Sequence, residues 1–64
     1  MLVNGKEITI KESQSLESFL LEHNYKPLLV AVELNGNIVK QKDFSNTQIT
    51  AADTLEIVSF VGGG

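Results

Sequence analysis

The chain ends in three consecutive glycines, and this tail is the segment best suited to chemistry. Val61 precedes Gly62, Gly63 and Gly64. At an average glycine frequency of about 7%, three glycines at a fixed place arise by chance roughly three times in ten thousand. Because glycine has no Cβ, such a tail can enter a narrow channel that excludes other residues. Four extended residues reach at most about 14 Å, enough to place the Gly64 carboxylate in a partner's active site.

A carboxylate is a poor acyl electrophile, and this limits the chemistry open to the tail. To react, it must first attack the α-phosphate of ATP and form an acyl-adenylate, from which AMP leaves when a sulfur or amine nucleophile attacks. A partner would supply the catalysis through positioning and stabilisation of charge. The sequence therefore predicts that Gly64 is the modified residue and that Gly62 and Gly63 give access to it.

The remaining side chains form no catalytic pattern. The chain has no cysteine, which excludes a cysteine nucleophile and a zinc–cysteine site. The one histidine, His23, ends a predicted helix, where it interacts favourably with the helix terminus. The eight carboxylates are scattered at spacings that suit no metal. We expect no catalytic residue, no metal and no bound cofactor, with ATP used by the partner enzyme.

Size and charge narrow the class of protein further. A chain of 64 residues is one domain with a thin core and little room for a deep cleft. The net charge is −3 and the five basic residues are all lysines, so nothing indicates a nucleic-acid partner. No apolar run approaches the roughly 20 residues of a membrane span. The absence of cysteine favours a cytoplasmic location.

Turn and helix signals divide the chain into short elements. Asn4-Gly5 and Asn35-Gly36 predict two tight turns, the first pairing Val3 with Lys6 and Met1 with Ile8. Apolar residues at helical spacing predict a helix over 16–23, with serine caps before it. We expect Asn24 to end this helix with a left-handed backbone conformation.

The other segments read as strands and turns. Residues 28–34 and 54–60 predict strands, residues 38–39 a short extended piece, residues 42–44 a helical turn and residues 52–54 a turn. This order predicts an α+β fold of the β-grasp (ubiquitin-like) type, with a mixed sheet of four to five strands packed on one main helix. We expect a domain over 1–60 and a flexible glycine tail over 61–64.

One helix can cover only one face of this sheet. Val58 and Phe60 fall towards the other face of the last strand, and Leu29 and Leu2 are out of phase with the inward residues. One interpretation is an exposed apolar patch near the C-terminus, of the kind that contacts proteins, formed by Leu29, Val58, Phe60 and Val61. The other is that some of these side chains fold under residues 37–46. The sequence favours neither.

The whole chain resembles the thiamine-biosynthesis sulfur carriers, the ThiS family of β-grasp proteins. The resemblance covers Asn4-Gly5, Ser15-Leu16, Glu33-Leu34-Asn35-Gly36, Ile38-Val39, Phe44, Asp53, Glu56-Ile57 and Phe60-Val61-Gly62-Gly63-Gly64. The short length and the terminal glycines are its specific part.

The resemblance implies a carrier that is not itself an enzyme. An E1-like adenylating enzyme would activate Gly64, and sulfur derived from a cysteine desulfurase would convert it to a thiocarboxylate. Thiazole synthase would then use that sulfur for the thiazole ring of thiamine. The family requires two terminal glycines, and this sequence has three. Removal of the last glycine would therefore make Gly63 the reactive residue.

Three alternatives stay open from the sequence. A molybdopterin-type sulfur carrier would use the same tail chemistry for another recipient. A ubiquitin-like modifier would transfer the adenylated glycine to a protein lysine. A plain interaction module would keep its function without Gly63 and Gly64, whereas a carrier would lose it.

Overall fold

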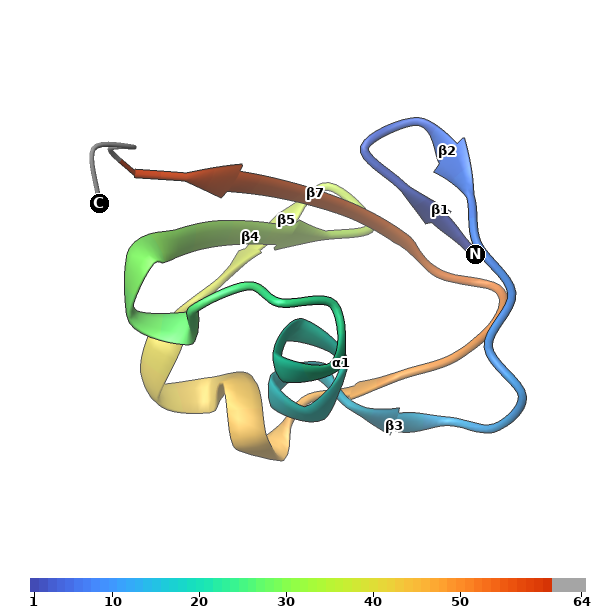
Figure 1. Cartoon of the computed structure of the whole chain (residues 1–64), viewed down its shortest axis with the longest axis horizontal. Coiled ribbons are helices and arrows are strands. Elements are labelled where there is room, and N and C mark those ends of the chain that lie inside the picture. Colours follow the sequence, from blue (N-terminus) through green and yellow to red (C-terminus); the bar gives the residue numbers. More distant parts are fainter. Residues whose placement is uncertain (61–64) are drawn as a thin grey trace.

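The computed structural model describes residues 1–60 of the chain. The main sheet has five strands in the order β2-β1-β7-β4-β5 (Figure 1). Strand β1 pairs in parallel with β7, and the other neighbours are antiparallel. The strands are β1 (Leu2–Val3), β2 (Lys6–Glu7), β4 (Val30–Leu34), β5 (Asn37–Val39) and β7 (Thr54–Ser59). The predicted mixed sheet is confirmed, with five strands.

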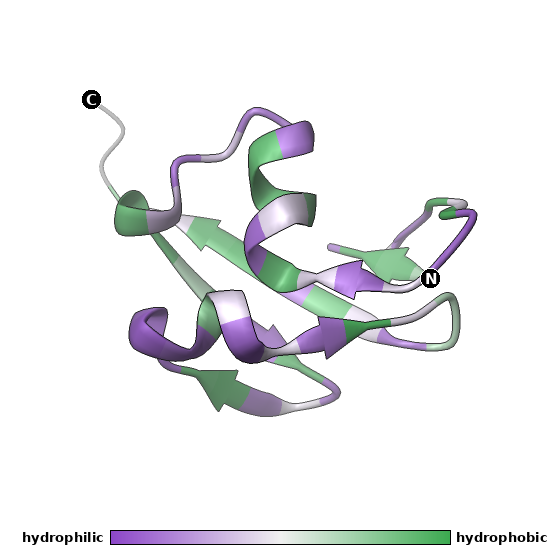
Figure 2. Cartoon of the chain, turned by 90° about the horizontal axis from the view of Figure 1, so that it is seen from below, coloured by the Kyte–Doolittle hydropathy of each residue, from purple (hydrophilic) through white to green (hydrophobic). Residues whose placement is uncertain are grey.

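A second layer lies against one face of this sheet. It holds the helix α1 (Leu16–Glu22), the 3₁₀ helix η2 (Gln41–Asn46) and a small antiparallel pair of β3 (Gln14–Ser15) with β6 (Gln48–Ile49). Figure 1 shows α1 and β3 beneath the sheet, and Figure 2, viewed from below, shows α1 in front of it. No helix formed by residues 1–60 has the length and hydrophobicity that a membrane span requires.

Both predicted Asn-Gly turns are confirmed. Asn4 and Gly5 have φ of 52° and 83°, and Asn35 and Gly36 have φ of 52° and 87°. Left-handed backbone at both central positions suits a hairpin turn, and asparagine and glycine adopt it at low cost. The first turn pairs Val3 with Lys6, and the Ile8 N–H donates to the Met1 carbonyl at 2.8 Å.

Helix α1 begins at the predicted residue and ends at Glu22, one residue before the predicted end, with His23 as its C-cap. The Ser15 hydroxyl accepts a hydrogen bond from the Ser18 N–H at 3.0 Å, and Asn24 terminates the helix with φ of 65°. His23 caps the C-terminus, with Nδ1 3.0 Å from the Phe19 carbonyl oxygen and the ring stacked on Phe19 at 4.0 Å. Because that nitrogen is occupied by the helix end, His23 acts here as a structural residue.

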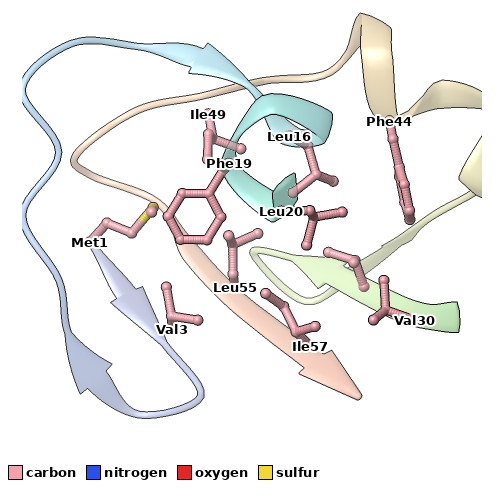
Figure 3. Close-up of a cluster of buried hydrophobic side chains, with 11 residues drawn as sticks. Met1, Val3, Leu16, Phe19, Leu20, Val30, Phe44, Ile49, Leu55 and Ile57 are labelled. Carbon is pink, nitrogen blue, oxygen red and sulfur yellow. The ribbon is translucent and has the colours of Figure 1, made fainter. Parts of the chain in front are cut away.

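The core lies between α1 and the sheet (Figure 3). Leu16, Phe19 and Leu20 point inward from the helix, and Phe44 points inward from η2. Burial of each such side chain contributes roughly 1.5–3 kcal/mol, so this cluster is the main source of stability. The buried residues are Met1, Val3, Leu16, Phe19, Leu20, Val30, Val32, Phe44, Ile49, Leu55 and Ile57.

Each of the two longer predicted strands has one wrong boundary. The strand predicted over 28–34 begins at Val30, because Pro27 starts a 3₁₀ turn, η1 (Pro27–Leu29), closed by the Leu29 N–H donating to the Lys26 carbonyl at 2.8 Å. Proline presets the φ of this turn. Strand β7 begins at Thr54 as predicted, after a turn closed by the Asp53 N–H donating to the Thr50 carbonyl at 3.1 Å, and it ends at Ser59, one residue before the predicted end.

The side chain of Asn4 extends the pairing of β7 beyond the end of β1. Its Nδ2 donates to the Ile57 carbonyl at 3.1 Å, and its Oδ1 accepts from the Ile57 N–H at 2.7 Å. These two bonds replace the backbone partner that β1 would have offered had it continued. The first turn therefore fixes the strand that leads towards the C-terminus.

We expect Asn4→Gly to lower the free energy of unfolding by about 1–2 kcal/mol, because two hydrogen bonds are lost while glycine still accepts the positive φ. Urea denaturation measures the change. Asn24→Gly is the control, since Asn24 also has positive φ but ends a helix, and its effect should stay near zero. Equal effects of the two substitutions would contradict the role assigned to the Asn4 side chain.

Candidate functional site

The predicted reactive residues Gly62, Gly63 and Gly64, together with Val61, lie outside the described residues. Their roles, and the predicted boundary between a domain and a tail, stay predictions. Strand β7 leads directly into this segment, so the described part of the site is the surface that β7 and its neighbours build.

The end of β7 is held by the strand beside it. Val30 lies opposite Ser59, and the Phe60 N–H donates to the Leu29 carbonyl at 2.7 Å. The pairing of these two segments therefore continues to the last described residue. The direction in which the chain leaves the domain is set by backbone hydrogen bonds up to Phe60.

The start of β7 is held by a cluster of side chains around Asp53. The Asp53 carboxylate accepts hydrogen bonds from Asn35 Nδ2 at 3.0 Å and from the Thr50 N–H at 2.8 Å. The Asn35 Oδ1 accepts from the Thr54 N–H at 2.9 Å. The bond from Asn35, followed by the bond from the Thr50 backbone, lowers the pKa of Asp53 below its ordinary value of 3.8.

The sheet face turned away from α1 is apolar near the end of β7, and we call it the outer face. It carries Ala31, Ile38, Val58 and Phe60, and Leu29, whose carbonyl accepts from the Phe60 N–H, lines the neighbouring groove beside Leu21. Val58 is 62% exposed, Phe60 47% and Leu29 40%, and Leu2 at the other end of the sheet is also exposed. Leu29, Val58 and Phe60 are therefore exposed, in agreement with the first of the two interpretations, while their role in binding a partner stays a prediction.

The alternative interpretation, that residues 37–46 cover these side chains, is wrong. From that segment Phe44 is buried in the core on the helix side, and Ile38 is itself 75% exposed. Strand β5 lies beside β4 as an edge of the sheet, so it enlarges the outer face and does not cover it.

The outer face also holds two carboxylates that the sequence does not single out. Glu33 of β4 lies directly opposite Glu56 of β7. A cavity of about 120 Å³ lies on this face beside them, lined by Ala31, Val32, Glu33, Ile38, Glu56 and Val58. Alternation within each strand places Glu33 and Glu56 outward, but only the register brings them together.

The hollows elsewhere on the domain include one polar and one apolar example. One, of about 500 Å³, runs between the 9–14 loop and α1, and polar groups line it together with His23. The other, of about 380 Å³, is an apolar groove between Leu21 of α1 and residues 25–29. Among residues 1–60, no group of three or more histidine or acidic side chains could hold a metal ion.

Comparison with known proteins gives a match along the whole chain. The model of the ThiS family matches residues 1–64. The sulfur carrier protein ThiS of Bacillus subtilis is 30% identical over 63 residues, covering 97% of this chain and 96% of that protein. A crystal structure of the thiamine biosynthesis protein ThiS from Geobacter metallireducens superposes with a TM-score of 0.80 at 33% identity, covering 98% of this chain and 96% of that chain. The β-grasp fold is therefore confirmed.

A longer relative matches as well. A thiazole synthase of Paramagnetospirillum magneticum is 36% identical over 64 residues, which is 100% of this chain. The chain spans only 20% of the length of that protein. The similarity therefore concerns a segment the size of this domain within a larger polypeptide.

The lowered pKa of Asp53 predicts a stability that falls in acid. Because the folded pKa lies below the unfolded one, the stabilisation is fully present above the unfolded value near 3.8 and is lost as the pH falls through the folded value. We expect Asp53→Asn to cost about 1 kcal/mol above pH 5, with the gap from the wild type shrinking below pH 3.8.

Denaturation at a series of pH values measures this gap. Asp43→Asn is the control, because Asp43 forms an exposed ion pair with Lys42 at 3.3 Å, and such pairs contribute little. A pH-independent gap for Asp53→Asn would show that its charge state is irrelevant to folding.

Proposed function

This chain belongs to the ThiS family, and from that membership we propose that it is a sulfur carrier of thiamine biosynthesis whose cargo is bound at the Gly64 carboxylate. The observation that carries the proposal is the family match over residues 1–64, which includes the terminal glycines. The near full-length similarity to a protein named sulfur carrier protein ThiS supports it.

The proposed chemistry takes place in three steps at one carboxyl group. The Gly64 carboxylate attacks the α-phosphate of ATP, and pyrophosphate leaves with formation of the acyl-adenylate. A persulfide sulfur derived from a cysteine desulfurase then attacks the acyl carbon and displaces AMP. A thiol reduces the resulting S–S bond and leaves the thiocarboxylate, with its own sulfur oxidised to a disulfide. An E1-like enzyme catalyses the first step, and this chain supplies the acyl group.

Thiazole synthase is the proposed acceptor of the sulfur. The similarity of this chain to a segment of a protein named thiazole synthase supports that partnership, since related domains occur within one polypeptide there. The thiocarboxylate suits the transfer because its soft sulfur is more nucleophilic than the oxygen it replaces. We place these reactions in the cytoplasm, where a reducing environment matches a chain without cysteine.

The outer face is the proposed partner-binding surface. Ordering each residue of a glycine tail in a channel opposes binding by about 1–2 kcal/mol, so contacts made by the folded domain must offset this cost. Leu29, Val58 and Phe60 are exposed where β7 leads into the tail, and Val61 continues that segment. Burying apolar area there stabilises a complex by about 25 cal/mol per Å².

We expect the wild-type protein to gain the mass of one sulfur replacing one oxygen when it is incubated with the adenylating enzyme, ATP and a sulfur donor. Intact mass spectrometry measures the change, and fragmentation assigns it to the C-terminal peptide. Modification at another residue, or none under conditions where the enzymes are active, would exclude the proposal.

The Gly64→Ala variant tests whether access depends on glycine. Sulfur incorporation should fall at least tenfold, because a Cβ clashes in a narrow channel, while the melting temperature stays that of the wild type. Efficient sulfuration of Gly64→Ala would contradict the narrow channel, and it would leave the carrier function standing.

We expect Phe60→Ala to weaken binding to thiazole synthase about tenfold, because aromatic residues are enriched at interfaces and the few residues that dominate binding each contribute more than about 1 kcal/mol. Titration calorimetry measures the affinity. Leu28→Ala is the matched control, since Leu28 is 77% exposed but lines the separate groove beside Leu21. Equal weakening by both substitutions would argue against the outer face as the docking surface.

A further inference from the structure

Two carboxylates of the outer face lie side by side without a compensating cation. Glu33 and Glu56 are directly opposite each other on antiparallel strands, which places their Cβ atoms about 5 Å apart. Within residues 1–60 the ion pairs are Met1 with Glu7 and Lys42 with Asp43, so neither Glu33 nor Glu56 has a basic partner there.

This pair works against the stability of the sheet. Like charges directly opposite on neighbouring strands are destabilising. Their neighbours on the same face are apolar, with Ile38 opposite Glu33 on β5 and Val58 two residues after Glu56. A local feature that conflicts with the fold commonly reflects a functional requirement.

A cavity lies between the two carboxylates and the apolar side chains. It measures about 120 Å³, and its lining includes Ala31, Ile38 and Val58 as well as the two glutamates. Ala31 lies opposite Val58, and its small side chain leaves room where a larger residue would fill the face. The cavity therefore offers apolar walls with negative charge at one side.

We propose that this cavity binds an arginine side chain of thiazole synthase as the anchor of the docking interface. The inference rests on the proposed function, which makes thiazole synthase a partner of this chain. The aliphatic part of the arginine packs on Ala31 and Val58, and the guanidinium lies between the carboxylates of Glu33 and Glu56. A planar guanidinium with five donors can bond both carboxylates at once, which a lysine ammonium cannot do with the same geometry.

The charge of the cavity supports this occupant over an apolar one. An apolar side chain in the cavity would desolvate two carboxylates without compensation, which is costly. An arginine neutralises the repulsion between them while it buries its own aliphatic stem. Arginine is also among the residues most often found at the energetic centre of protein interfaces.

The test compares two double variants of equal charge. Glu33→Gln with Glu56→Gln should weaken binding to thiazole synthase about 30-fold or more, because the arginine is left without its charged partners. Glu12→Gln with Glu22→Gln removes the same charge from exposed positions on the 8–13 loop and on α1, and its affinity should stay within about twofold. Titration calorimetry at a single salt concentration gives both values.

The free proteins provide a second readout. The Glu33→Gln and Glu56→Gln double variant should melt about 1–5 °C above the wild type at low salt, because the repulsion across the sheet is gone. Lower affinity together with higher stability distinguishes an anchor from a pair that only supports the fold. A variant that melts lower than the wild type, or that binds like the control, overturns the proposal.

The same variants separate this inference from the proposed function. Sulfur incorporation at saturating adenylating enzyme tests the carrier function and should be unchanged by the glutamate substitutions. Weakened binding to the adenylating enzyme alone, with thiazole synthase unaffected, overturns the assignment of the arginine to thiazole synthase. If the wild-type protein binds thiazole synthase but gains no sulfur, the carrier chemistry is excluded. The arginine anchor is then decided by the binding comparison of the two double variants alone.

Discussion

The seven-residue helix α1 can cover only one face of the five-stranded sheet, and the exposed apolar residues of the outer face follow from this limit. Leu16, Phe19 and Leu20 use the whole apolar stripe of the helix to close the core. The elements beside the helix, η2 and the β3–β6 pair, lie in the same layer and add Phe44 and Ile49 to that core. The other face keeps its apolar residues exposed, so the core forms on one side of the sheet and an uncovered apolar surface remains on the other.

Strand β7 contributes to both faces of the sheet, because its inward residues close the core and its outward residues form part of the outer face. Its position is fixed at three points: by Asn35 and Asp53 at its start, by Asn4 in its middle and by the pairing with β4 at its end. Both asparagines belong to Asn-Gly turns. Each turn therefore reverses the chain and also supplies an asparagine side chain that holds the last strand in place by hydrogen bonds.

The sequence predicts these features unequally, for physical reasons. The Asn-Gly turns and the capped helix depend on local backbone preferences, so four or five residues are enough to identify them. The β3–β6 pair has two residues in each strand, too few for an alternating pattern, and it is visible only through contacts such as the Leu16 N–H donating to the Thr47 carbonyl.

Long-range contacts could not be predicted from the sequence, for a different reason. Asn4 and Ile57 are 53 residues apart, and nothing in the first turn indicates which strand its side chain meets. The Glu33–Glu56 pair depends on the register of β4 against β7, and a shift of one residue would send each side chain to the opposite face. The exposed patch could be inferred because it needs only alternation within one strand, whereas the carboxylate pair needs two strands placed relative to each other.

In the proposed function the carrier binds an adenylating enzyme and thiazole synthase in turn, and such a carrier benefits from specificity that is obtained by charge. A large apolar interface would bind tightly and slow the release needed before the next encounter. Charge complementarity instead raises the association rate and rejects wrong partners, with a smaller contribution to the final affinity. The repulsion between Glu33 and Glu56 lowers the stability of the free domain, but a fold whose core is closed by eleven buried apolar residues can tolerate that loss. On this account the outer face combines modest apolar area, which offsets the ordering of the tail, with a pair of charges that selects where the tail is delivered.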